Sequence, residues 1–356
     1  MSGGGQPVDT TQESIYSYVQ DLFCSGIVIV VGSGASSGYG LPGMSALASY
    51  LIDTVPEKVA QLGSQCQAEW KLISIELAAD VGLETALGSG HVSESLVDLI
   101  TDLTANCIQQ SEQVAIASIL GASRVSSFGR LFEHILKATP VANVITTNYD
   151  RLIEVHAAKA GVRVDSMYYG HTVGRLDATL SREELFRAQT VAGRPLTTSL
   201  TPRSHIRLSK PHGSLDWFTH EGQHFRSDLS VPGARRIIAP GGDKYRLGYE
   251  APFDAHRTRA NNSIDSASAF LFVGYGFNDE HLQTHLRPRF PNVPAVILSR
   301  NLTDNALEYL GLNPTSIGIE STTDPGRCRV TRGPTVLELD APLWDLEHLM
   351  KDVLSI

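Results

Sequence analysis

The stretch IVIVVGSGASSGYGLP, residues 27–42, combines a short apolar run with a glycine-rich turn. The β-branched run Ile27 to Val31 needs cover on both faces, which predicts a buried strand. The glycine-rich turn spans residues 32–43, and a helix is expected near residues 44–54. A strand, a tight turn and a helix in this order predict one unit of a parallel α/β sheet.

Similar patterns recur along the chain. Further strands are expected at residues 141–146 (VANVIT), 269–273 (AFLFV), 294–298 (PAVIL) and near 335–339. Helices are expected at residues 11–24, 150–160 and 342–354, and residues 162–260 mix short strands with loops. Residues 57–138 have mostly helical spacing of apolar side chains. The sequence therefore predicts a Rossmann-like, doubly wound parallel sheet with a helical insertion lobe at about 57–138, in one domain from residue 11 after a disordered N-terminus at 1–10.

Composition narrows the class of protein. The net charge is −9, which argues against direct binding to nucleic acid phosphates. The chain has neither the long apolar run of a membrane span nor the features of a signal peptide. Its four cysteines are scattered without a CxxC pair, so we expect neither a four-cysteine zinc site nor structural disulfides. A cytoplasmic protein is expected.

Four short motifs carry the candidate chemistry. Gly32-Ser33-Gly34-Ala35-Ser36 follows a strand, so its glycines and helix start can accommodate a pyrophosphate, or they form only a strand–helix turn. Thr146-Thr147-Asn148-Tyr149-Asp150 places polar side chains at a strand end, where Asp150 can also be a helix cap. Lys210-Pro211-His212-Gly213-Ser214 offers an imidazole suited to acid–base work, although a lone histidine is more often a surface or core residue. Gly274-Tyr275-Gly276-Phe277-Asn278-Asp279 can hold a ribose or phosphate, or cap a helix.

Together and in this order, the motifs resemble those of the sirtuin family, in particular its bacterial sirtuin-like NADase branch, over roughly residues 25–300. The family's GAGxS…GxP pattern corresponds to residues 32–36 with Gly40-Leu41-Pro42. Its TxNxD pattern corresponds to residues 146–150, and its catalytic HG to His212-Gly213. Asn301, after the strand at 294–298, is a looser match to the family's ribose-binding asparagine.

Two departures separate the chain from deacetylase sirtuins. Gly43-Met44-Ser45 stands where those enzymes have Asp-Phe-Arg, and the cysteines cannot form their zinc module. The resemblance therefore implies NAD as substrate without zinc, and an NAD+ hydrolase that releases nicotinamide and ADP-ribose in anti-phage defence. An NAD-dependent deacylase or ADP-ribosyltransferase, and a non-enzymatic NAD or ADP-ribose sensor, remain open alternatives.

The resemblance also implies roles for individual residues. Asn148, His212 and Asp150 are the expected catalytic residues: Asn148 orients ribose or water, His212 acts as a base, and Asp150 binds the carboxamide or a ribose hydroxyl. The expected NAD-binding residues are Gly32, Ser33, Gly34, Ala35, Ser36, Pro42, Thr147, Gly274, Gly276, Asn278 and Asn301. Because unregulated NAD loss would kill the cell, we expect control by homo-oligomerisation or by a HerA-type hexameric ATPase partner.

One further motif invites a metal site. His220-Glu221-Gly222-Gln223-His224 fits the HExxH pattern of zinc proteases, which requires both histidines on one face of a helix. The central glycine and the flanking aromatic residues instead predict a hairpin turn.

Overall fold

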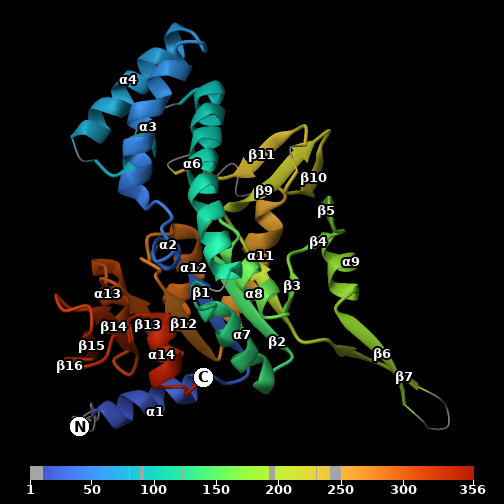
Figure 1. Cartoon of the computed structure of the whole chain (residues 1–356), viewed down its shortest axis with the longest axis vertical. Coiled ribbons are helices and arrows are strands. Elements are labelled where there is room, and N and C mark those ends of the chain that lie inside the picture. Colours follow the sequence, from blue (N-terminus) through green and yellow to red (C-terminus); the bar gives the residue numbers. More distant parts are fainter. Residues whose placement is uncertain are drawn as a thin grey trace.

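A nine-stranded sheet forms the centre of the computed structural model, which describes residues 11–79, 81–88, 92–121, 123–191, 197–229, 231–240 and 250–356 (Figure 1). The strand order is β16-β15-β14-β13-β12-β1-β2-β8-β3. Its strands are β1 (Ile27–Val31), β2 (Val141–Thr146), β3 (Arg163–Asp165), β8 (His205–Ser209), β12 (Ala269–Val273), β13 (Ala295–Ser299), β14 (Ile317–Ser321), β15 (Cys328–Arg332) and β16 (Thr335–Leu339). The strands from β14 to β3 run parallel, and β15 and β16 are antiparallel at one edge.

Strand β1 lies at the centre of this sheet. All five of its residues are buried, and it pairs in parallel with β2 on one side and β12 on the other. The chain builds one half of the sheet after β1 and returns across it to build the other, which makes the β1–β12 boundary a topological switch point. The predicted doubly wound parallel sheet is confirmed.

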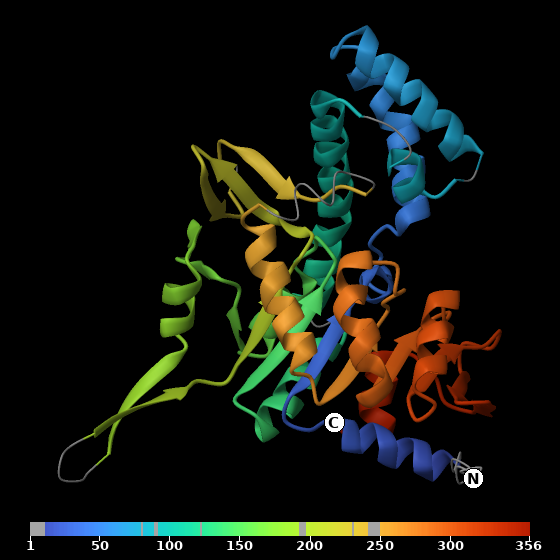
Figure 2. The ribbon, with the colours of Figure 1, turned by 180° about the vertical axis from the view of Figure 1, so that it is seen from behind.

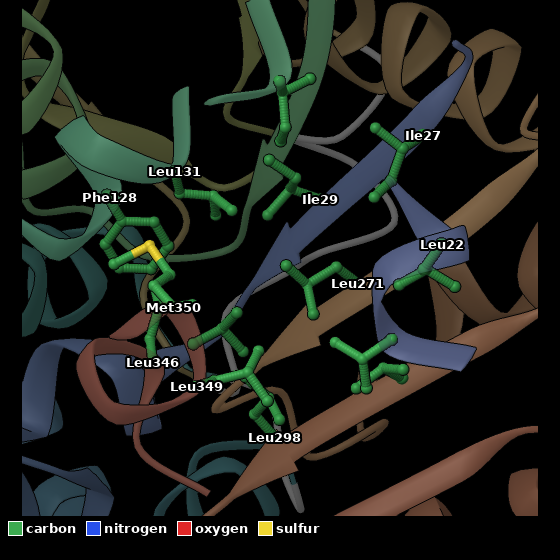
Figure 3. Packing of buried hydrophobic residues seen from close by; sticks show 14 of the residues in the cluster. Leu22, Ile27, Ile29, Phe128, Leu131, Leu271, Leu298, Leu346, Leu349 and Met350 are labelled. Atoms are coloured by element: carbon green, nitrogen blue, oxygen red, sulfur yellow. The ribbon is translucent and has the colours of Figure 1, made fainter. Parts of the chain in front are cut away.

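Alternate residues of β1 face two separate layers of helices. Ile27, Ile29 and Val31 pack in a core with α1 (Gln12–Leu22), α7 (Ser127–Ala138) and α14 (Leu346–Asp352), as Figure 3 shows. Val28 and Val30 pack in a second core on the opposite face. The helices of that face are α11 (Phe253–Asp265), α12 (Glu280–Arg289) and α13 (Asp304–Leu312), next to the 3-10 turn η1 (Phe290–Asn292). The period-2 alternation of a strand thus buries β1 from both sides.

A helical lobe projects from the sheet (Figures 1 and 2). It contains α3 (Met44–Val59), α4 (Ser64–Ala78), α5 (Leu83–Gly88) and the first part of α6 (Glu94–Leu120), which share a core of their own. The lobe therefore begins at Met44, earlier than the predicted residue 57. Helix α7 lies outside it, because its apolar face at Phe128, Leu131 and Phe132 packs on the sheet. Helical periodicity predicts a helix, but it does not say which surface covers the apolar face.

A second, five-stranded sheet has the order β11-β9-β10-β5-β4. Its strands are β4 (Tyr168–Tyr169), β5 (Gly174–Leu176), β9 (Gly213–His220), β10 (Gln223–Arg226) and β11 (Ala234–Ile237). The hairpin β6 (Phe186–Val191)–β7 (Thr197–Pro202) and the helix α9 (Ala178–Glu183) complete this region. Glu221 and Gly222 have φ of 49° and 71° between β9 and β10, so the predicted hairpin turn in the HExxH segment is confirmed.

Several elements differ from the prediction. The helix α8 (Leu152–Lys159) starts two residues after Asp150, and α2 (Ser33–Ser37) is a short helix inside the predicted glycine turn. Helix α11 and strands β14 and β15 were not predicted. Helix α11 has a polar sequence, FDAHRTRANNSID, which hides the face that carries buried Phe253 and Ile264. In the described residues, we find no helix with the length and apolarity of a bilayer span.

We expect stability to fall on mild acidification because of His156 in α8. Its ring is buried beside Tyr39 and Phe128, and Nδ1 lies 2.9 Å from the Ser126 hydroxyl. Burial, with a smaller effect of Lys159, lowers the pKa of His156 from 6.5 to about 4. Between these values the unfolded chain binds a proton that the folded chain does not. The stability that neutral His156 contributes above pH 6.5 is therefore lost as pH falls towards 4, by roughly 3 kcal/mol.

Urea unfolding from pH 7 to pH 4 measures this effect. The free energy of unfolding of the native chain should approach that of a His156→Gln variant as pH falls. The exposed His171 provides the control, since His171→Gln should keep the native pH dependence. A constant difference between the native chain and His156→Gln would contradict the assignment.

Candidate functional site

The candidate site lies at one edge of the large sheet, where the four parallel strands β1, β2, β8 and β12 end. Val31 of β1 is in register with Thr146 of β2 and Val273 of β12, and Ile145 is in register with Ser209 of β8. The four motifs singled out in the sequence begin at or directly after these strand ends. The structure therefore brings the four motifs to a single edge, which is where open α/β sheets bind ligands.

The glycines of the first motif make close contact with the glycine turn after β12. Gly34 donates its amide hydrogen to the carbonyl of Gly274, with 3.0 Å between N and O. A Cβ on Gly32 would lie 2.4 Å from the Gly274 oxygen, and one on Gly274, where φ is +59°, would lie 2.2 Å from the amide nitrogen of Ala35. Glycine is thus required here because two backbones touch. The Gly34 amide is already used within the protein, whereas Ser33 is exposed.

A chain of buried hydrogen bonds joins the first motif to the second. Asn148 donates from Nδ2 to the Gly32 carbonyl at 3.0 Å and to the Ser36 hydroxyl at 2.9 Å. Ser36 in turn donates to Oδ2 of Asp150 at 2.7 Å. The other oxygen of Asp150 accepts the amide hydrogen of Leu152, the first residue of α8, at 3.1 Å. The carboxamide of Asn148 is therefore held in one orientation by bonds to the first motif.

A buried lysine supports the same loop from behind. Lys210 is 2% exposed, and Nζ donates to the carbonyl of Asp150 at 2.5 Å and lies 3.2 Å from a carboxylate oxygen of Glu154. Burial raises the pKa of Asp150 and of Glu154, and the positive charge of Lys210 opposes both shifts. A buried ammonium with an ion-pair partner and several acceptors is costly to displace, so it fixes the loop.

His212 faces the carboxylate of Asp279, which was not among the predicted site residues. Its Nε2 lies 2.5 Å from Oδ2 of Asp279, and both side chains are almost entirely buried. The second oxygen of Asp279 accepts the amide hydrogen of Leu282 at 3.1 Å and caps α12. With Nε2 directed at Asp279, the other ring nitrogen, Nδ1, is the one available to a ligand.

Tyr149 connects the asparagine loop to the histidine turn. Its carbonyl accepts the amide hydrogen of Leu215 at 3.0 Å, and its hydroxyl donates to the carbonyl of Ile238 at 2.5 Å. Ile238 then donates its amide hydrogen to the carbonyl of His212 at 2.9 Å. Gly213 has φ of +88°, and a Cβ there would lie 2.2 Å from the Arg236 carbonyl oxygen. The His-Gly turn therefore packs on β11 only with glycine at this position.

The loop after β12 positions Asp279. Phe277 has φ of 58°, a left-handed conformation that bulky residues rarely adopt. Its buried ring lies 4.7 Å from that of Phe272 and 4.6 Å from that of Tyr309, measured between centroids. This aromatic cluster stabilises the strained backbone two residues before Asp279.

The remaining predicted residues lie around this cluster. Pro42 and Thr147 are half-buried, and the Thr147 amide donates to the Val31 carbonyl at 3.4 Å. Gly276 accepts from the Thr303 hydroxyl through its carbonyl. Asn278 is exposed and accepts from Asn305 at 2.8 Å, and Asn301 is exposed after β13. Their roles in ligand binding stay predictions.

Three residues of the site were not predicted from the sequence. Asp279 was considered only as a cap, Lys210 only as part of a motif, and His256 not at all. His256 is fully buried on α11 and accepts the amide hydrogen of Lys210 at Nδ1, 3.2 Å away. Burial lowers the pKa of His256 well below 6.5, so the neutral ring is an acceptor at neutral pH. The only local signal was an acidic residue directly after a strand-end glycine turn.

The cysteines do not form a common site. Cys24, Cys66, Cys107 and Cys328 are free and lie after α1, in α4, in α6 and in β15. Within the described ranges, no group of three or more His, Cys, Asp or Glu side chains is arranged to hold a metal ion.

The fold and site define a doubly wound α/β domain with a polar cluster at its switch point. Residues 142–290 match the family model of the SIR2-like domain. The matched segment includes Asn148, Asp150, His212 and Asp279. No curated protein matches the sequence.

Solved structures with a similar course of the chain include Sir2 enzymes. One comes from work on the mechanism and regulation of Sir2 enzymes (13% identity, TM-score 0.41, covering 83% of this chain and 88% of that chain). Another is a mutant Sir2 homologue in complex with 2'-O-acetyl ADP-ribose (12%, 0.42, 84% and 88%). A third is a Sir2 homologue in complex with NAD (11%, 0.38, 86% and 88%).

We expect Gly274→Ala to destabilise the protein strongly. The added methyl would overlap the Ala35 amide nitrogen, and alanine is strained at φ of +59°. Overpacking and strain together predict a loss of about 2–4 kcal/mol in the free energy of unfolding. Urea unfolding measures it, with Gly311→Ala in α13 as the control, because a Cβ at Gly311 meets nothing within 4 Å. Equal stability of the two variants would argue against the contact between the glycine turns.

Proposed function

We propose that this chain is an NAD+ hydrolase that cleaves the nicotinamide–ribose bond at the strand-end cluster. The observation that carries the proposal is the pairing of His212 with Asp279 on the same sheet edge as the oriented carboxamide of Asn148. The match of residues 142–290 to the SIR2-like domain supports NAD as the substrate.

The donors at this edge fit the parts of NAD. The imidazole of His212, paired with Asp279, can accept a proton from a ribose hydroxyl or from a water molecule. The neutral amide of Asn148 can hydrogen-bond to the ribose, which becomes cationic, without forming an ion pair with it. The diphosphate would lie along the first motif, where Ser33 is exposed, and near the glycine turn at Gly274 and Gly276. The Gly34 amide is engaged with Gly274, so the hydroxyl of Ser33 is the better candidate for a phosphate contact.

The reaction breaks the bond from ribose C1' to the nicotinamide nitrogen, and its electron pair leaves with neutral nicotinamide. Water adds to C1' and loses a proton, which gives ADP-ribose and completes the balance. The transition state is cationic at the sugar, as in glycoside hydrolysis. His212 accepts the proton through Nδ1, with Asp279 stabilising the charged ring. Asn148 orients the ribose or the water, and Asp150 acts through Ser36, since its oxygens bind Ser36 and Leu152.

An active NAD hydrolase must be controlled, because continuous loss of NAD is lethal to a cell. We therefore extend the proposal to NAD depletion in anti-phage defence, with activity gated by homo-oligomerisation or by a HerA-type ATPase partner. NAD turnover measured alone and with the protein encoded next to this one tests the gating. Equal activity in both samples would refute control by that partner.

We expect His212→Ala and Asn148→Ala each to abolish NAD loss while the protein stays folded. The measurement is nicotinamide release from NAD alone, together with urea unfolding. The matched control is His285→Ala, because His285 of α12 also forms a histidine–aspartate pair, at 2.9 Å from Asp265 at the end of α11 and outside the proposed site. Full activity in either site variant would refute the role of that residue. Turnover that requires an acyl-lysine or another acceptor would identify a deacylase or transferase, and binding without turnover would identify a sensor.

Asp279→Asn separates the two tasks of Asp279. Asparagine caps helices as well as aspartate does, so stability should change by less than about 0.5 kcal/mol. The negative charge facing His212 is lost, so nicotinamide release should fall by about a hundredfold or more. Unchanged activity in a folded Asp279→Asn variant would show that the pair has no part in catalysis.

A further inference from the structure

A second candidate site lies at the opposite edge of the sheet. The chain has a net charge of −9, yet it contains no Asp or Glu between Glu184 and Asp216. The basic residues of this interval are Arg187, Arg194, Arg203, Arg207 and Lys210. A positively charged segment in an acidic protein produces a local field that attracts anions.

The fold gathers part of this charge around one cavity. Arg163, Arg187, Arg203 and Ser204 line a cavity of about 350 Å³. Arg163 is the first residue of β3 and is in register with His205, the first residue of β8. Arg203 and Ser204 directly precede β8 in the chain. The cavity thus lies at the amino ends of β3 and β8, whereas Lys210 and His212 follow the carboxyl end of β8.

The hairpin β6–β7 supplies the third guanidinium. Arg187 is directly opposite Thr201 in the antiparallel ladder, and the ladder continues with a hydrogen bond from the Arg203 amide to the Leu185 carbonyl at 2.7 Å. Arg203 is two residues beyond Thr201, so it lies on the same face of the hairpin as Arg187, as a diagonal neighbour. Side chains of this length reach a common ligand from such positions.

These three positive charges are not compensated within the described part of the chain. No carboxylate lies within ion-pair distance of Arg163, Arg187 or Arg203 there. The acidic residue of β3, Asp165, is already paired with Arg259 at 3.1 Å and accepts from the Ser181 hydroxyl. Other arginines of the molecule, such as Arg151 and Arg226, have carboxylate partners. Three like charges around one cavity repel each other unless an anion lies between them.

We propose that this cavity binds a small ligand with a phosphate or diphosphate group. Guanidinium groups bind phosphate oxygens with two parallel hydrogen bonds, and the Ser204 hydroxyl adds a neutral donor. The volume is that of a pocket for a nucleotide-sized molecule. The three guanidinium groups line a single open cavity at the surface and do not follow a long stripe, which favours a small ligand over a nucleic acid strand.

Titration calorimetry of the full chain with inorganic pyrophosphate tests the proposal. We expect saturable binding that an Arg163→Gln/Arg203→Gln variant weakens by about tenfold for each guanidinium removed. The matched control is Arg175→Gln, because Arg175 is an exposed arginine of β5 that does not line the cavity. Ser33→Ala, which removes the proposed phosphate contact of the NAD site, should bind pyrophosphate as the native chain does, which separates this site from the proposed NAD site.

Three outcomes would overturn the proposal. Pyrophosphate that does not bind, or that binds the double variant as tightly as the native chain, would exclude a phosphate site here. Sulfate that binds as well as pyrophosphate at equal ionic strength would show only a general attraction of anions. A single-stranded oligonucleotide that binds more tightly than pyrophosphate, and loses affinity in the same double variant, would make nucleic acid the ligand.

Discussion

The contact between two glycine turns at the ends of β1 and β12 is the constraint on which the site depends. Gly34 bonds to Gly274 across the switch point, and neither Gly32 nor Gly274 has room for a Cβ. This contact fixes the start of α2, where Ser36 receives the bond from Asn148. It also fixes the start of the loop that leads to Asp279. Glycine at a strand end often makes room for a ligand. Here Gly32 and Gly274 make room for the backbone of the other turn.

The polar residues behind the site form a buried ionic layer. Lys210 binds the loop at the carbonyl of Asp150. The pKa of Asp216 lies below its usual value, because the positive charges of Arg226 and Lys210 outweigh the effect of burial, which alone would raise it. Glu112 of α6 is fully buried and bonds both to the Arg151 guanidinium and to its backbone amide, the latter at 2.5 Å. Removing one member would leave an uncompensated buried charge. Helix α6, which begins in the helical lobe, is thus tied to the loop at Asp150 and Arg151 by charge as well as by apolar packing.

The sequence predicts the elements that lie in the sheet better than the contacts between them. Ile27–Val31, Val141–Thr146 and Ala269–Val273 have the predicted bounds. Ile27–Val31 and Ala269–Val273 are apolar at every position because both faces of each strand are buried. Helix α11 was not predicted because its buried face is interrupted by polar residues. His256 bonds to Lys210, directly after β8, and Arg259 pairs with Asp165 of β3. The convergence of the four motifs could be inferred from parallel topology alone. The pairing of His212 with Asp279 could not, because it depends on two loops from opposite halves of the sheet.

Asp279 shows why this pairing is a property of the fold and not of a motif. One oxygen caps α12 and the other faces His212, so the direction of the carboxylate is set by where the helix begins. A helix N-terminus favours negative charge, and this is the charge that a protonated imidazole requires beside it. The helix start is in turn set by Phe277, whose left-handed backbone is stabilised by the aromatic cluster on the sheet. A change in that aromatic core would therefore alter the direction of the carboxylate that faces His212.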